Sequence, residues 1–208
     1  MADWVPVDFQ VPEAQRLADL TGVASDLDMA REICRTYVNY DEQGVLSDLW
    51  LKMSLSMAAV VMYLRTSTSG VRAGIGSDHV RALPEPLREF HLHVKDLRDK
   101  WVAHSVNSLE ETNVVVYPAP RELGVRRIDQ VSTQHRFTCT LSIREASQLI
   151  DLCLALKAIV DGDIEAEKTR LLEFARSLPI DTFYEEPDRY KLKRDARGAG
   201  VPRQRYGA

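Results

Sequence analysis

Arg98, Asp99 and His104 are the residues whose types and spacing point most directly to chemistry in this chain of 208 residues. They share one helix-like segment, Arg-Asp-Lys-Trp-Val-Ala-His. A guanidinium can hold phosphate oxygens through two parallel hydrogen bonds, and an imidazole gains or loses a proton near neutral pH. RNA carries its own nucleophile, the 2′-hydroxyl. An arginine and a histidine brought together could therefore cut RNA without a metal ion.

The same residues also fit a structural role, which periodicity alone favours. His104 follows Trp101 on an apolar stripe, where a histidine could hydrogen-bond a helix C-terminus. Arg98 could be a surface residue paired with Asp99. Six residues of ideal helix place two side chains about 240° apart around the axis and about 9 Å along it. Arg98 and His104 therefore meet only if the helix loosens, or if a two-fold axis joins two copies.

Other site chemistries find little support in the sequence. His91 and His93 are two residues apart, so on a helix they point to different sides and could not chelate one metal. The three cysteines are far apart, and no glycine-rich phosphate loop or zinc-protease pair is present. We expect neither a metal nor a cofactor.

Charge is distributed unevenly along the chain. The net charge is −4, from 27 basic and 31 acidic residues, which does not indicate a strongly basic nucleic-acid binder. Residues 188–208 hold seven basic and two acidic residues, a net +5, which leaves −9 for residues 1–187. We expect this tail to be disordered in isolation. It is either a solvated terminus or an arm that contacts phosphates.

The apolar run at residues 53–64 is bracketed by Lys52 and Arg65. Twelve residues are too few to span a bilayer, so the run predicts a buried core helix and no membrane association. An odd number of cysteines and the lack of a signal peptide predict a cytoplasmic protein. Cys34 and Cys153 fall in apolar helical patterns and are expected in the core.

Four helices are predicted before residue 105. They cover residues 12–20, a second segment starting at residue 25, residues 46–64 and a fourth starting near Pro86. Their expected core stripes are Met29, Ile33, Tyr37 and Tyr40 in the second, Leu46, Leu49, Trp50, Met53, Met57, Val60, Val61 and Leu64 in the third, and Leu87, Phe90, Val94, Leu97, Trp101 and His104 in the fourth.

Short strands are predicted next, at residues 113–117 and 134–141, with a third at 124–128. A long helix starts at Ser142 with a capping box to Glu145, and residues 161–163 could kink or split it. The fold class is therefore mainly α: a helical bundle with a small β-hairpin or sheet inserted after the fourth helix. We expect a single domain over residues 1–187, with the strands at about 112–141, followed by the basic tail.

Residues 97–105 resemble the signature of the HEPN superfamily, in which an arginine is followed by a polar residue and then, after four to six intervening positions, by a histidine. The form Arg-Asp-Lys with Ala-His-Ser is similar to HEPN-like proteins of bacterial abortive-infection and prophage origin. His91, one heptad before Arg98, and residues 63–65 and 71–72 also look like that group.

The resemblance implies a metal-independent endoribonuclease that acts as a homodimer, of the kind found in toxins and phage-defence effectors. It assigns proton transfer to His104, phosphate and transition-state contacts to Arg98, and an orienting role to Asp99. RNA and an antitoxin or regulatory protein would be the partners. The alternative is a non-catalytic HEPN-like scaffold that binds a partner protein or RNA, with His104 completing a core or dimer seam.

Overall fold

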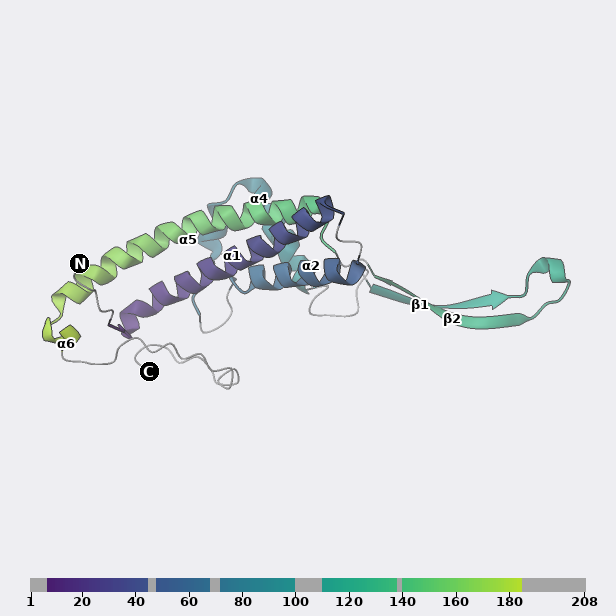
Figure 1. Ribbon diagram of the computed structural model, residues 1–208, viewed down its shortest axis with the longest axis horizontal. Helices are drawn as coiled ribbons and strands as arrows, with labels where there is room; N and C mark the ends of the chain where they lie inside the picture. Colours follow the sequence, from purple (N-terminus) through teal and green to yellow (C-terminus); the bar gives the residue numbers. More distant parts are fainter. Residues whose placement is uncertain (1–6, 45–47, 68–71, 100–109, 138–139, 185–208) are drawn as a thin grey trace.

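Two long antiparallel helices, α1 (Gln15–Glu42) and α5 (Ile143–Ser177), lie side by side along the body of the protein (Figure 1). The computed structural model describes residues 7–44, 48–67, 72–99, 110–137 and 140–184. α2 (Leu49–Leu64) packs on α1, and α4 (Glu85–Leu97) packs on α5. An antiparallel hairpin of β1 (Glu110–Pro118) and β2 (Ile128–Phe137) projects beyond them. The predicted class, mainly helical with a small β insertion after the fourth helix, is confirmed.

The described residues also form four shorter elements. They are two 3-10 turns, η1 (Pro12–Ala14) and η3 (Arg121–Leu123), and two short helices, α3 (Ser77–Arg81) and α6 (Asp181–Tyr184).

α1 is one continuous helix, so the prediction of two separate helices is wrong. Ser25 and Asp26, which resemble a helix start, lie in its middle; the Asp26 carboxylate instead accepts a hydrogen bond from Arg72 at 2.7 Å. The predicted core stripe of this segment is also partly wrong, because Met29 and Tyr40 are exposed. The face of α1 that packs inward carries Leu20, Val23, Leu27, Ala30, Cys34 and Tyr37.

α5 begins as predicted, at a capping box. The Ser142 hydroxyl accepts from the Glu145 backbone N–H at 3.2 Å, and the Glu145 carboxylate accepts from the Ser142 N–H at 2.7 Å. Two orphan donors of the first turn are thereby satisfied. The helix passes residues 161–163 unbroken, so no split occurs there. Its buried face includes Ala146, Leu149, Cys153, Leu156 and Val160.

The packed side of α2 matches the prediction only in part. Its buried face carries Ser56, Ala59, Val60 and Tyr63; Val60 belongs to the predicted stripe, and Leu64 of that stripe packs partly buried against the core. The outer face of α2, defined by Trp50, Ser54, Met57 and Val61, is turned away from this buried face; Trp50 is 63% exposed and Val61 39%. The packed side is displaced from the predicted stripe because α2 is apolar nearly all round, so spacing alone does not identify it.

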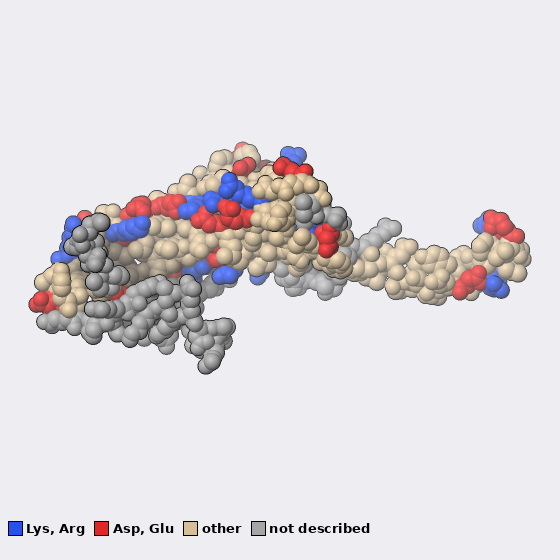
Figure 2. All heavy atoms as spheres, viewed as in Figure 1, with Lys and Arg blue, Asp and Glu red and all other residues tan. Residues whose placement is uncertain are grey.

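The hairpin, residues 110–137, is called the arm below. Its register pairs Val116 with Val131 and Val114 with Thr133, and these residues share one face because side chains alternate along a strand. Val114, Val116 and Val131, the apolar face of the arm, are 69%, 51% and 63% exposed. The other face is mixed: Asn113 lies opposite Gln134, and Val115 and Tyr117 lie on the same side. Figure 2 shows the shaft of the arm without charge clusters, and acidic and basic groups gather again at its tip.

The tip of the arm corrects the prediction of a third strand at residues 124–128. The chain there forms the turn η3, and Gly124 follows with a left-handed backbone (φ 65°), a conformation that glycine adopts without steric cost. The Ala119 N–H donates to the Arg127 carbonyl at 2.9 Å and closes the turn. β2 therefore starts at Ile128, earlier in the chain than the predicted strand at 134–141.

Among the described helices, none combines the length and the apolar character that a bilayer crossing requires. Cys34 and Cys153 are buried as free thiols, as predicted. Burial raises the pKa of Cys34 to about 12 and also raises that of Cys153, so neither thiol ionises near neutral pH. Cys139 and the basic tail at 188–208 lie outside the described residues.

Candidate functional site

Arg98 and Asp99 lie where α4 ends. The helix is anchored on its inner side by Phe90 and Val94, which are buried as the sequence predicts. At Arg98 and Asp99 the backbone widens into a π-type turn. Such local widening changes the direction of side chains relative to an ideal α-helix and recurs at functional sites. This widening begins at Arg98, the first of the three predicted site residues.

The Arg98 guanidinium donates from Nη1 to Asp99 Oδ1 at 2.8 Å, and the side chains are 54% and 47% exposed. This pair brings two of the three predicted site residues together. His104 lies outside the described residues, so its position relative to Arg98 is not part of the structure. An exposed ion pair of this kind adds little to stability, so it leaves the guanidinium available for a phosphate.

α4 is held in place by a buried hydrogen bond between His91 and Tyr63 of α2. Tyr63 Oη lies 2.6 Å from His91 Nδ1, and the rings meet edge to face at a centroid separation of 5.9 Å. Burial, helped by the charge of Lys95, lowers the pKa of His91, and burial raises the pKa of Tyr63. Both groups are therefore neutral at pH 7. With the imidazole proton on Nε2, the tyrosine hydroxyl donates to Nδ1. His91 is a positioning residue of the helix that carries Arg98.

A second contact ties α4 to the start of α5. His93 Nε2 lies 3.1 Å from Glu145 Oε1, the carboxylate of the capping box. Burial acts to raise the pKa of Glu145, but hydrogen bonds from Ser142 and His93 outweigh it, so the pKa of this carboxyl is lowered. The sequence predicts the box but not its link to α4, because the two residues are 52 positions apart.

Arg65 and Arg72, which belong to the wider resemblance, serve the body of the protein. Asp26 of α1 lies 2.7 Å from Arg72 Nη2 and 3.6 Å from Arg65 Nη2. One heptad earlier, the Asp19 carboxylate accepts from the Ala73 N–H at 2.9 Å. Both aspartates are almost fully buried. They fasten the segment after residue 71 to α1, a structural role that the spacing of Asp19 and Asp26 on one helix face could have indicated.

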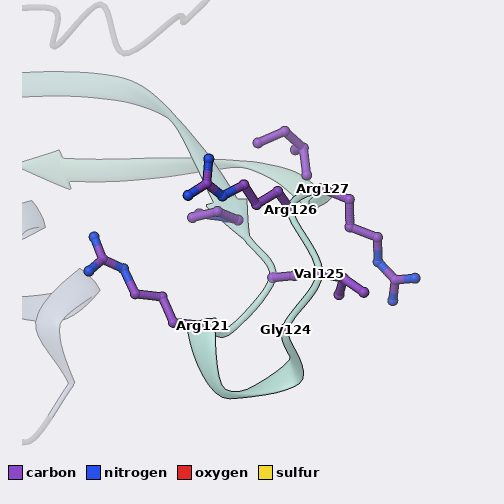
Figure 3. A pocket seen from close by; sticks show the side chains of 8 residues that line it. Arg121, Gly124, Val125, Arg126 and Arg127 are labelled. Carbon is purple, nitrogen blue, oxygen red and sulfur yellow. The ribbon is translucent and has the colours of Figure 1, made fainter.

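A separate hollow of about 760 Å³ lies at the tip of the arm, away from Arg98 (Figure 3). Arg121, Arg126 and Arg127 line it, and Arg127 is paired with Asp129 at 2.6 Å. Figure 3 shows Arg127 pointing away from the other two guanidinium groups. The hollow is formed by one turn, with no carboxylate, histidine or thiol in its lining, so it offers charge but no acid–base chemistry.

The described residues gather no group of three or more histidine, cysteine, aspartate or glutamate side chains in reach of one metal ion. Comparison with protein-family models, with curated proteins and with solved structures finds no match for this chain. The function of this chain is therefore inferred from its own residues.

Proposed function

We propose that this protein is a HEPN-like endoribonuclease that needs no metal ion, with Arg98, Asp99 and His104 as its site. The observation that carries the proposal is the state of Arg98. Its guanidinium is more than half exposed at the widened end of α4 and is paired with the neighbouring Asp99. Arg72, by contrast, is 20% exposed and bonded to Asp26 and to the Arg65 carbonyl. Arg98 therefore has the accessibility that a phosphate ligand requires.

The proposed chemistry is attack by the 2′-oxygen of RNA on the adjacent phosphorus. The new O2′–P bond forms as the bond from phosphorus to the 5′-oxygen breaks, which yields a 2′,3′-cyclic phosphate and a 5′-hydroxyl. His104 moves a proton between these oxygens, because imidazole titrates near neutral pH. Arg98 neutralises the charge that develops on the phosphate oxygens. Asp99 orients the guanidinium through the 2.8 Å contact.

The test is cleavage of a labelled RNA in the presence of EDTA. Loss of an acid–base group costs about 10²–10⁴-fold in rate, so we expect His104→Ala and Arg98→Ala each to lower cleavage at least 100-fold. Arg98→Lys keeps the charge but not the two-pronged geometry, and should recover only part of the rate. The matched control is Lys95→Ala, which removes an exposed cation from the same helix. Cleavage that survives both alanine variants would rule the proposal out.

In cells, such an enzyme would act as a toxin or phage-defence effector that a neutralising protein restrains. Expression of the wild-type chain should then arrest growth, and the Arg98→Ala and His104→Ala variants should not. Equal growth arrest by all three proteins at matched expression would exclude RNA cleavage as the cause.

A non-catalytic scaffold is the second candidate, and the exposed apolar side chains on the outer face of α2 and on the arm favour it. Contiguous exposed apolar surface marks sites of protein association. Under this alternative His104→Ala lowers stability or association and there is no RNA cleavage to lose. Thermal melting of the same variants that are used for the cleavage assay separates the two functions.

A further inference from the structure

We propose that the apolar face of the arm binds the outer face of α2 in a second copy of this chain. A two-fold axis then produces two identical contacts, one from each arm. The inference does not depend on nuclease activity, because it concerns two surfaces whose apolar side chains are largely exposed.

The arm requires a partner on physical grounds. An isolated two-stranded hairpin is at best marginally stable in water. Here Val114, Val116 and Val131 lie on one side of both strands and are each at least half exposed. Ile128, opposite Pro118 and nearer the tip, is 60% exposed. A ribbon that exposes this much β-branched surface gains stability when another apolar surface covers it.

α2 offers a surface of the same character. Trp50, Ser54, Met57 and Val61 follow one line along the helix, at steps of three and four residues. The one charged side chain among the residues of α2, Lys52, lies on a different side of the helix and is paired with Asp41. The outer face therefore presents no charge that would have to lose its hydration when an apolar strand pair covers it.

The two surfaces match in length and cannot meet within one chain. Nine residues of β1 extend about 30 Å, and the sixteen residues of α2 extend about 24 Å. Figure 1 shows the arm projecting away from the helical body, so the arm does not lie along its own α2. A second copy supplies both an arm and an α2 in this arrangement, which makes the contact self-complementary.

The area is sufficient for a dimer. A contact about 24 Å long and about 10 Å wide covers about 240 Å² on each surface. Two contacts with two surfaces each then bury about 1,000 Å², which is near the lower limit for a specific interface. We therefore expect a dimer in equilibrium with monomer at micromolar concentrations, not a permanent one.

Sedimentation velocity of the full chain tests the contact from the arm side. Val116→Glu with Val131→Lys replaces the apolar pair by an opposed ion pair, which keeps the cross-strand attraction. We expect this variant to be a monomer, because its dimer dissociation constant should be at least tenfold higher than that of the wild type. The control, Asn113→Glu with Gln134→Lys, places the same charges at an opposed pair on the other face of the arm and should dimerise like wild type.

The α2 side is tested by Trp50→Glu with Val61→Lys. These charges suit the two ends of the helix dipole, so the helix itself is preserved. Its control is Met29→Glu with Leu92→Lys, which are equally exposed apolar residues of α1 and α4. We expect the α2 variant to be monomeric and its control to dimerise. Unchanged circular dichroism and melting temperature confirm that each variant is folded.

Mixing the arm variant with the α2 variant decides which surfaces meet. The wild-type arm of one protein can still bind the wild-type α2 of the other, so a heterodimer held by one contact should appear, weaker than the wild-type dimer. Pairing of arm with arm, or of α2 with α2, would give no such rescue and would overturn the proposal. It is also overturned if the wild-type chain stays monomeric at 100-fold above micromolar concentration, or binds lipid vesicles through these faces without dimerising.

Discussion

Tyr63→Phe tests whether the buried hydrogen bond to His91 holds α4 against α2. The substitution removes one oxygen and leaves the ring, so it creates no sizeable cavity in a site where Tyr63 has no exposed surface. It leaves His91 Nδ1 buried without its partner at 2.6 Å. An orphaned buried acceptor costs about 1–3 kcal/mol. For a chain of this size we expect the melting temperature to fall by about 2–12 °C.

The measurement is urea unfolding at pH 7.5, compared with Tyr40→Phe, which removes a hydroxyl from a residue that is 41% exposed. The control should change the free energy of unfolding by less than about 0.5 kcal/mol. Combining Tyr63→Phe with His91→Leu removes both polar partners, so the double variant should be less destabilised than the sum of the single variants. A Tyr63→Phe variant as stable as its control, or a double variant worse than the sum, would refute the reasoning.

Three further outcomes are expected. Since burial lowers the pKa of His91, the unfolded chain takes up this proton first as pH falls below about 6.5. The free energy of unfolding should therefore fall between pH 7.5 and 5.5, and this part of the slope should vanish in His91→Leu; an identical slope would contradict it. Ser142→Ala removes the N-cap of α5 and should cost about 1 kcal/mol in urea unfolding, while Ser147→Ala, inside the same helix, should cost less. Deleting residues 188–208 should weaken RNA binding and flatten its dependence on salt, since seven basic residues are lost; an unchanged salt slope in filter binding excludes the tail as a phosphate contact.

The elements with one apolar side were predictable from the sequence. α4 and α5 have polar residues opposite their apolar stripes, so the buried side follows from spacing, as Val94 and Leu149 show. α2 has no polar side, and its orientation is set by contacts that spacing does not encode. One of these is the Ser56 hydroxyl, which accepts from the Leu141 N–H at 3.0 Å. The break expected in α1 was wrong because Asp26 binds an arginine from another element.

The residue types of the candidate site were predictable from the sequence, and the described geometry covers Arg98 and Asp99. Arg98 and Asp99 could be selected because charged residues beside a histidine have recognisable chemistry, and their pairing is local in sequence. The residues that hold α4 in place could not be identified from the sequence. His91 meets Tyr63 across 28 positions, and a single sequence contains no signal for such a pair.

The arm also constrains how this protein can change over evolutionary time. Its strands contact none of the described helices along most of their length, so the arm can grow or shrink without repacking the core. Because side chains alternate along a strand, only insertions of two residues in each strand preserve which side Val116 and Val131 occupy. Each such insertion would move the tip outward by about 7 Å. Related chains are therefore expected to carry arms whose lengths differ in even steps, while a single-residue insertion would reverse the apolar side and be lost.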